Sequence, residues 1–198
     1  GGSKISTKIS LLNNLIRQFK CVAIGGAMAN TFLLSKDITV GKSLVEQDLV
    51  EMAKDIQKKA NQFNCKLILP LDVICGKSIE DRDPIEFDIN DISKNYMILD
   101  LGTKTTALIN QEIKNSKMVL WNGPVGAFEY KSYERATNEI ALNIKQNVKQ
   151  FGINALAGGG DTVSAIKNAN AEDGFDYISN AGGAFLEWLE GNQSPGII

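Results

Sequence analysis

The sequence predicts an α/β fold with a doubly wound, mostly parallel sheet and helices on both faces. Three observations predict it. Short apolar runs recur along the chain, most of them end in a glycine turn, and a helical pattern of apolar residues follows each turn. This alternation is typical of parallel strands joined by crossover helices. We therefore expect one Rossmann-like, three-layer domain over residues 1–198, with its glycine turns along the edge where such sheets bind ligands.

The composition is that of an ordinary globular domain, with 43% hydrophobic and 22% charged residues. The net charge of −2 argues against a broad nucleic-acid-binding face, which needs excess Lys and Arg. No apolar run approaches the roughly 20 residues that a membrane-spanning helix needs. We expect a cytoplasmic monomer whose partners include neither nucleic acid nor membrane.

The chain has no histidine and three cysteines. Without histidine, Ser-His-Asp and Cys-His catalysis are excluded, along with most transition-metal sites. Cys21, Cys65 and Cys75 lie in or beside apolar runs without C-x-x-C spacing, so we expect buried free thiols. The chemistry must therefore use Lys, Asp, Glu and backbone amides, with Mg²⁺ as an optional addition.

The first quarter of the chain predicts a helix, a strand and a second helix. Apolar residues at helical spacing predict a helix from about residue 4 to 19, with Lys4 and Lys8 on one face at its beginning. Cations there oppose the helix dipole. A solvated face explains them as well as an anion site does. A buried strand over 21–24 follows, then Gly25-Gly26 and an apolar helical run through residues 31–33.

The remaining elements follow the same alternation. We expect helices at about 45–62, 103–113, 133–148 and 185–190, and strands at 66–70, 71–75, 97–101, 118–121, 153–157 and 177–179. Residues 76–95 are charged and irregular, and we expect an antiparallel strand near 85–89 within them. The strand at 118–121 ends in a turn rich in Gly and Pro, at residues 122–126.

The stretch Leu156–Thr162 contains three glycines followed by Asp161-Thr162. A strand, a glycine turn and a helix start leave unpaired N–H groups at the positive end of a helix dipole, which suits a phosphate. Asp161 suits a phosphate that carries Mg²⁺, and Thr162 supplies a hydroxyl. The structural alternative is a glycine turn that Asp161 merely caps.

The glycine spacing does not fit a dinucleotide site. The G-x-G-x-x-G fingerprint would need glycine at Val163, and no other window supplies it. A dinucleotide oxidoreductase is therefore disfavoured. Phosphoryl transfer fits the glycine turns, the two lysines and the acidic residue at a helix start better, because the protein then mainly positions the phosphates and neutralises their charge.

Five segments stand in order along nearly the whole chain: Gly1-Gly2-Ser3-Lys4 with Lys8, Ile24–Phe32, Trp121–Glu129, Gly158–Thr162 and Ser179–Ala184. Together they resemble the C-terminal, nucleotide-binding half of phosphoglycerate kinase. The resemblance implies reversible phosphoryl transfer between 1,3-bisphosphoglycerate and Mg-ADP, giving 3-phosphoglycerate and Mg-ATP in glycolysis.

The resemblance also implies roles for individual residues. Lys4 and Lys8 would pair with nucleotide phosphates and the transferring group, which the amides of Gly182 and Gly183 would face. Asp161 would hold the metal, and Glu129 would bind the ribose. The other nucleotide-binding positions implied are Gly2, Gly25, Gly26, Ile98, Asn122, Gly123, Gly159, Gly160 and Thr162. Of these, Gly25, Gly26 and the loop near Ile98 would wall the adenine.

The sequence departs from this family in two ways. Many relatives have Gly at the positions of Ala27, Ala181 and Ile98, Pro at that of Thr103, and a hydroxyl residue at that of Asn180. The family's N-terminal half, which carries the phosphoglycerate site, has no counterpart in the chain. We therefore expect a fragment that binds Mg-nucleotide with little or no transferase activity alone. An inert or regulatory nucleotide-binding module remains the alternative.

Overall fold

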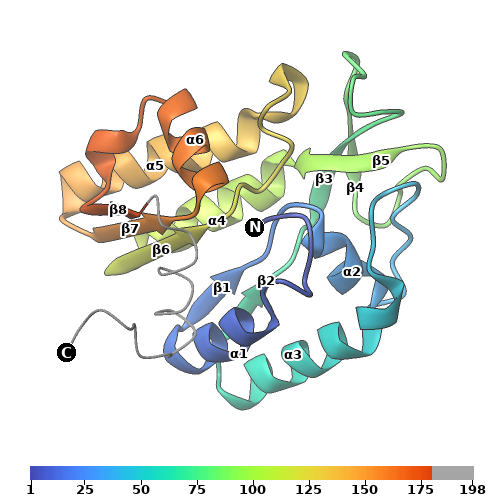
Figure 1. Ribbon diagram of the computed structural model, residues 1–198, viewed down its shortest axis with the longest axis horizontal. Coiled ribbons are helices and arrows are strands. Elements are labelled where there is room, and N and C mark those ends of the chain that lie inside the picture. Colours follow the sequence, from blue (N-terminus) through green and yellow to red (C-terminus); the bar gives the residue numbers. More distant parts are fainter. Residues whose placement is uncertain (180–198) are drawn as a thin grey trace.

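The computed structural model describes residues 1–179 of the chain (Figure 1). Its helices are α1 (Ile9–Gln18), α2 (Met28–Leu34), α3 (Val50–Gln62), α4 (Thr103–Lys114), α5 (Arg135–Phe151) and α6 (Gly160–Asn168). Its strands are β1 (Cys21–Ala23), β2 (Lys66–Ile68), β3 (Asp72–Gly76), β4 (Ile85–Asp88), β5 (Met97–Leu101), β6 (Met118–Asn122), β7 (Asn154–Gly158) and β8 (Tyr177–Ser179). Short 3₁₀ turns are η1 (Gln47–Leu49), η2 (Lys131–Tyr133) and η3 (Glu172–Gly174). The helix expected at 185–190 lies outside the described residues.

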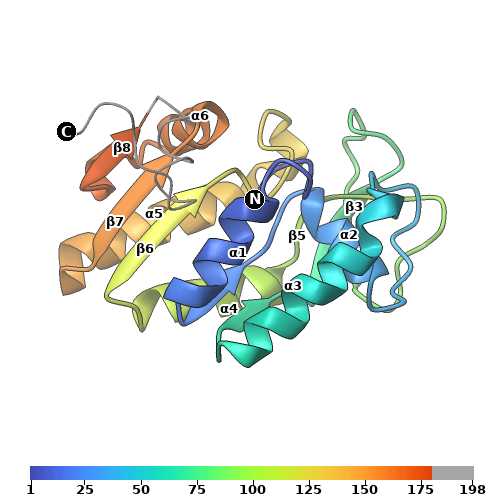
Figure 2. The ribbon, with the colours of Figure 1, turned by 60° about the horizontal axis from the view of Figure 1, so that its bottom comes forward.

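The α/β class is confirmed, because two of the sheets are parallel and helices lie on both sides of their strands (Figure 2). β1 pairs with β2, and β6, β7 and β8 form a second parallel sheet. Side chains alternate between two cores, as a strand buried on both faces requires. Cys21 packs with the cluster formed mainly by α4, α5 and β7, whereas Val22 belongs to the cluster around α1, α2 and α3.

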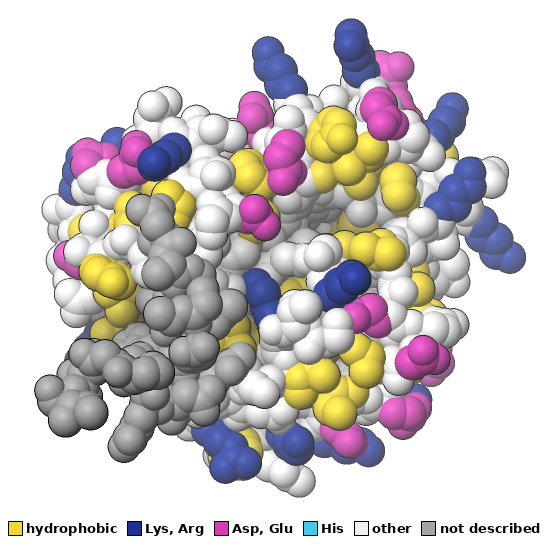
Figure 3. Space-filling model, viewed as in Figure 1, with side chains coloured by type: hydrophobic (Ala, Val, Ile, Leu, Met, Phe, Trp, Pro, Cys, Tyr) yellow, Lys and Arg dark blue, Asp and Glu magenta, His cyan; other side chains and the backbone are white. Residues whose placement is uncertain are grey.

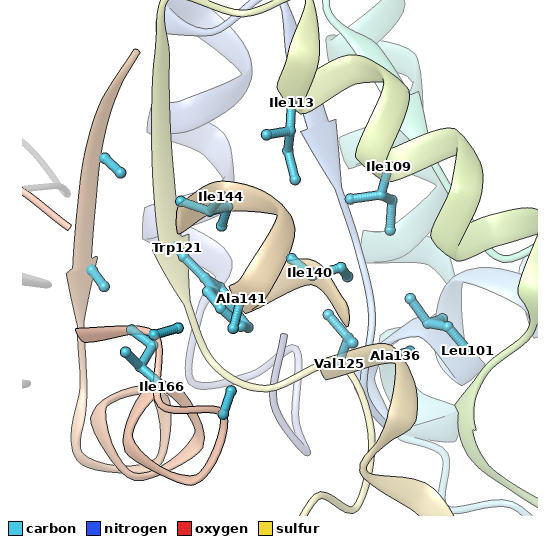
Figure 4. Close-up of a cluster of buried hydrophobic side chains, with 14 of the residues drawn as sticks. Leu101, Ile109, Ile113, Trp121, Val125, Ala136, Ile140, Ala141, Ile144 and Ile166 are labelled. Carbon is cyan, nitrogen blue, oxygen red and sulfur yellow. The ribbon is translucent and has the colours of Figure 1, made fainter. Parts of the chain in front are cut away.

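The first of these cores holds α4 and α5 against the sheet that carries the central glycine turn. Figure 4 shows Ile109 and Ile113 of α4, Ile140 and Ile144 of α5, and Trp121 of β6. All five side chains are buried, at most 7% exposed. Burying a large aliphatic side chain contributes roughly 1.5–3 kcal/mol. This packing fixes the carboxyl ends of β6 and β7, where the candidate site begins.

In the middle of the chain, the strands form a separate antiparallel sheet beside the mostly parallel ones. β3 pairs antiparallel with both β4 and β5 in a third sheet, and the antiparallel strand expected near residues 85–89 is confirmed as β4. The apolar run from residue 66 to 75 divides at Pro70, so β2 and β3 belong to different sheets. Proline cannot donate a backbone hydrogen bond, which favours the end of a strand at this point.

The first helix begins later than its periodicity predicts. α1 starts at Ile9 with Lys8 at its N-cap, and the Lys8 N–H donates to the Ile5 carbonyl at 2.7 Å in a preceding turn. The cause is long-range: the Glu46 carboxylate accepts hydrogen bonds from the N–H groups of Ile5 and Ser6. Lys4 therefore does not share a helix face with Lys8.

The start of α4 accounts for one departure from the family pattern. The Thr103 N–H donates to the Glu86 carboxylate at 2.5 Å, and those of Lys104 and Thr105 donate to the Asp72 carboxylate at 2.7 and 2.8 Å. Proline at position 103 would have no N–H to donate. Here two carboxylates from the neighbouring antiparallel strands satisfy the first turn instead.

Candidate functional site

The glycine turns gather at one edge, as predicted, because hydrogen bonds join the carboxyl ends of the parallel strands. The Gly26 N–H after β1 donates to the Val125 carbonyl after β6 at 2.8 Å. The Gly159 N–H after β7 donates to Ser179 of β8 at 3.2 Å. In the view of Figure 3, a hollow opens near the centre of the molecule, with basic side chains on one rim and acidic ones on the opposite rim.

The turn from β7 to α6 has the geometry of an anion site. Gly159 has φ +102°, which a residue with a Cβ rarely adopts, and α6 begins at the next residue. The N–H groups of Gly160, Asp161 and Thr162 lie in the first helical turn, so no carbonyl of the helix can accept from them. A Cβ added at Gly160 would meet nothing within 4 Å among the described residues, so this backbone is open to a ligand.

The Thr162 hydroxyl makes hydrogen bonds within the protein, whereas the sequence suggested it as a group that binds a ligand. The buried hydroxyl donates to the Gly158 carbonyl at 2.8 Å and accepts from the Gly123 N–H at 2.7 Å. The hydroxyl proton and one of its lone pairs are thus used inside the protein. The hydroxyl holds the β6 turn against the β7 turn, and the backbone N–H of Thr162 has no acceptor within α6.

Lys8 reaches the same edge from α1. Its Nζ donates to Asn122 Oδ1 at 2.6 Å and to the Gly1 carbonyl at 2.5 Å, and the Asn122 amide donates to the Gly158 carbonyl at 2.7 Å. Burial lowers the pKa of Lys8 from 10.5 to about 8, and the negative charge of Asp161 opposes that shift. The ammonium of Lys8 therefore lies in the electrostatic field of the first α6 turn.

The glycine turns at the N-terminal end pack directly on this arrangement. The Met28 N–H at the start of α2 donates to the Gly2 carbonyl at 3.0 Å, and Gly2 and Gly26 have φ of +124° and +70°. A Cβ at Gly26 would overlap the backbone of Gly2, and one at Gly25 would overlap the side chain of Val125. Glycine is needed here because backbones approach one another closely.

Other predicted site residues lie apart from this network. Lys4 is exposed, and Glu129 is exposed without a hydrogen bond or ion pair to any described residue. Ile98 lies within β5, in agreement with the strand expected at 97–101, and its N–H donates to the Ser43 hydroxyl at 2.8 Å. Gly182, Gly183, Ala181 and Asn180 lie outside the described residues.

No group of three His, Cys, Asp or Glu side chains within residues 1–179 could hold a metal ion by itself. Asp161, exposed in the first turn of α6, is the carboxylate of the candidate site. Mg²⁺ commonly binds through one or two carboxylates together with substrate phosphates and water. The arrangement therefore fits a metal that arrives with a phosphate rather than one held by a protein cage.

An apolar cavity of about 190 Å³ lies behind the candidate site. Lys8 and Asn122 line one end, and the remaining wall is mostly aliphatic side chains of α1, α4, α5 and β1 with the strand β6. Asp161 and Gly160 are not part of its lining. The anion-binding geometry is thus outside this cavity, at the adjoining turn.

The cysteines match the expectation of free thiols. Cys65 and Cys75 are buried, Cys21 is partly buried, and none forms a disulfide. Burial raises the pKa of Cys75 to about 12, and burial with nearby Glu112 raises the pKa of Cys21 to about 11. These thiols are therefore not activated as nucleophiles.

Sequence reasoning missed Asp100, whose carboxyl lies behind the loop from 122 to 129. It is 1% exposed and has a pKa raised to about 7, mainly by burial. The signal was an acidic residue within the apolar run Met97–Leu101.

Among the described residues, no helix is long and apolar enough to cross a membrane.

Comparison with known proteins finds relatives that all belong to one family. The family model described as phosphoglycerate kinase matches residues 1–192. The chain is 45% identical to a phosphoglycerate kinase of Cereibacter sphaeroides and 43% identical to one of Chelativorans, covering 100% of this chain and 50% of each relative.

Solved structures agree with these sequence matches. A phosphoglycerate kinase from Coxiella burnetii superposes with a TM-score of 0.94 at 37% identity, over 98% of this chain and 49% of that one. One from Pyrococcus horikoshii OT3, at 24% identity and a TM-score of 0.80, shares the fold. The chain spans about half the length of the curated relatives it matches. By sequence and by structure, this chain belongs to the phosphoglycerate kinase family.

Proposed function

We propose that this chain is the nucleotide-binding half of a phosphoglycerate kinase and binds Mg-ADP and Mg-ATP as a single domain. The proposal rests on Lys8, which is linked through Asn122 to the Gly158 carbonyl before α6 and interacts electrostatically with Asp161 in the open first turn of that helix. A cation, a helix N-terminus and one exposed carboxylate meet at one turn. A phosphate that carries Mg²⁺ is a ligand with complementary charges for this combination.

The residues around the β7–α6 turn and at the start of α1 would have separate roles in binding the phosphates. The N–H groups of Gly160, Asp161 and Thr162 would donate to phosphate oxygens, with Gly159 providing the close approach. Lys8 would neutralise phosphate charge once the ligand displaces one of its present acceptors, Gly1 or Asn122. Lys4, which is exposed and lies apart from this network in the structure, would have to approach the bound phosphates to add a second cation.

Asp161 would hold the metal through its carboxylate. The metal supplies charge neutralisation to the phosphates when it is bound. The chain's own part is to orient: the Asn122 amide and the Thr162 hydroxyl fix the β6 and β7 turns, so the α6 amides keep one geometry. Such preorganised donors contribute strongly to phosphoryl transfer because that chemistry consists mostly of positioning and charge stabilisation.

The base and the ribose would lie on the side of Gly25, Gly26, Ile98 and Glu129. Glu129 is free of protein partners among the described residues, which suits a carboxylate that accepts from ribose hydroxyls. Gly2 and Gly123 shape the phosphate end of the site, and Gly182 and Gly183 would face the transferring phosphoryl group.

The reaction would be the reversible transfer between 1,3-bisphosphoglycerate and ADP in cytoplasmic glycolysis. The chain spans half of its relatives, and the half with the phosphoglycerate site would be its partner. We expect the 198-residue chain alone to have little or no transferase activity. The alternative is a catalytically inert nucleotide-binding module, which uses the same binding residues.

Calorimetric titration of Mg-ADP into the chain tests the binding proposal. We expect binding in the unchanged chain, and its loss in the double variant Lys8→Ala, Asp161→Ala. The matched control is Lys167→Ala, Glu172→Ala, which removes the same two charges from the far end of α6. Undiminished binding in the Lys8 and Asp161 variant, or no binding by the folded unchanged chain, would contradict the proposal.

A mixing experiment separates the kinase half from the inert module. The N-terminal half of a full-length relative is added in trans, and ATP formation from 1,3-bisphosphoglycerate and Mg-ADP is measured. ATP formation only in the mixture supports the kinase half. Nucleotide binding without ATP formation in the mixture supports the inert module, provided that the added half binds 3-phosphoglycerate.

A further inference from the structure

Asp100 of β5 lies between two segments that are distant in sequence, the loop from 122 to 129 and the start of α5. Its side chain is 1% exposed. One carboxyl oxygen, Oδ2, accepts a hydrogen bond from the Ala136 N–H at 2.9 Å, in the first turn of α5. This bond satisfies one of the N–H groups that a helix start leaves unpaired.

The other oxygen, Oδ1, lies against the loop. A Cβ added at Gly126 would overlap Oδ1 and would also come within 2.9 Å of the Tyr133 carbonyl oxygen. Within residues 1–179, Oδ1 has no hydrogen-bond partner although it is buried. At the next residue of the loop, the Ala127 N–H donates to the Leu99 carbonyl at 2.8 Å, so the loop is held on β5 directly beside Asp100.

We propose that Asp100 is a positioning residue for the candidate nucleotide site, because its buried carboxyl fixes the loop from 122 to 129 against the first turn of α5. The inference rests on the proposed function, since that loop carries Asn122 and Glu129. Asp100 itself touches neither of them and acts through Gly126. Only a glycine fits at this contact, so the fit between Asp100 and the loop is close.

The protonation state of Asp100 makes this positioning sensitive to pH near neutrality. Burial raises the pKa of Asp100 to about 7, and the charge of Glu139 adds to that rise, while the N–H groups of Ala136 and Leu101 and the charge of Arg135 oppose it. Its pairing partner in β3 is Ile74, which is apolar, and Tyr133 donates its hydroxyl to the Asp81 carbonyl. Glu129, the single titratable side chain of the loop, is exposed.

The two states of the carboxyl differ at Oδ1. The neutral acid can be packed against Gly126 without an uncompensated charge. The carboxylate leaves Oδ1 charged and buried without a hydrogen bond to any described residue, which is costly and favours displacement of the loop toward water. We therefore expect Mg-ADP affinity to fall as the pH rises through 7.

The test compares the unchanged chain with Asp100→Asn, which keeps the shape and removes the titration. Mg-ADP dissociation constants are measured at pH 6, 7 and 8, and the ratio between the two proteins is used because the nucleotide's own titration cancels in it. We expect the unchanged chain to weaken at least threefold relative to Asp100→Asn between pH 6 and 8. The matched control is Asp72→Asn, a similarly buried carboxylate of β3 that accepts hydrogen bonds from the first turn of α4, and its ratio should not change with pH.

Amide hydrogen exchange of Gly126 and Ala127, measured without nucleotide, reports the loop by itself. Protection that falls between pH 6 and 8 in the unchanged chain, after correction for intrinsic exchange, and stays constant in Asp100→Asn supports the inference. Equal pH dependence of both proteins in affinity or in exchange overturns it. If neither protein binds Mg-ADP, the proposed function fails, and the exchange data alone decide whether Asp100 positions the loop.

Discussion

The Nζ atom of Lys8 lies 2.6 Å from Oδ1 of Asn122, although 114 residues separate them. Lys8 precedes α1 and Asn122 ends β6, so this hydrogen bond joins the N-terminal turn to the central parallel sheet. Both side chains are partly buried. The relationship brings a lysine to the turn that precedes α6, where the proposed phosphate site lies.

Replacing Lys8 by Met should weaken Mg-ADP binding about tenfold or more, because a hydrogen bond to a charged group contributes about 1.5–3 kcal/mol. Methionine retains most of the side-chain volume, so the buried stem stays packed. Calorimetry measures the change, and Lys167→Met on α6 is the control. An unchanged affinity in Lys8→Met would exclude contact between this ammonium and the nucleotide.

Lys8 should also shape the pH dependence of stability. Its pKa falls from 10.5 to about 8 on folding, so between these values the unfolded chain binds a proton that the folded chain releases. Stability attributable to Lys8 therefore rises with pH from about 8 toward 10.5, and below pH 8 the cost of burying the charge is constant.

Denaturant unfolding at pH 8, 9 and 10 checks this sign. The difference in unfolding free energy between the unchanged chain and Lys8→Met should change in favour of the unchanged chain as the pH rises. A difference that is constant over this range would show that Lys8 titrates alike in both states.

Thr162→Val should destabilise the fold by about 1–3 kcal/mol, because it leaves the buried Gly123 N–H without an acceptor. Thr162→Ser keeps the hydroxyl and should recover most of that loss. Urea unfolding of the two variants gives the comparison. Equal loss in both variants would mean that the methyl group, rather than the hydroxyl, supports the turns.

Gly159 and Gly160 should respond differently to alanine. Gly159→Ala should cost roughly 1–3 kcal/mol of stability, because φ is +102° there. Gly160→Ala has open space around its Cβ and should leave stability unchanged or slightly raised. If the phosphates approach this backbone, Gly160→Ala should nevertheless weaken Mg-ADP binding about tenfold, and equal affinity would place the phosphates elsewhere.

Much of the fold follows from local pattern. The alternation of strands, glycine turns and helices predicts the α/β class, because glycine permits the backbone geometry that such turns need. The direction of β3 does not follow, since periodicity shows that a strand is buried but not which neighbour it pairs with. The late start of α1 also depends on a distant residue, because Glu46 holds the turn before it.

The candidate site was predictable in its residues more than in its contacts. Lys8 is linked through Asn122 to the Gly158 carbonyl before α6. The inward use of the Thr162 hydroxyl depends on Gly123, 39 residues away. Asp100 belongs to no motif, and its burial against Gly126 depends on the packing of segments that are distant in the sequence. A single acid in an apolar strand was its only trace in the sequence.

The most direct test of nucleotide binding at the α6 turn is amide NMR of the chain during titration with Mg-ADP, with Mg²⁺ alone as the reference. We expect the largest shift changes at Gly160, Asp161 and Thr162, with smaller ones at Lys8 and Asn122. Saturable changes confined to another surface, or none at these amides, would contradict it.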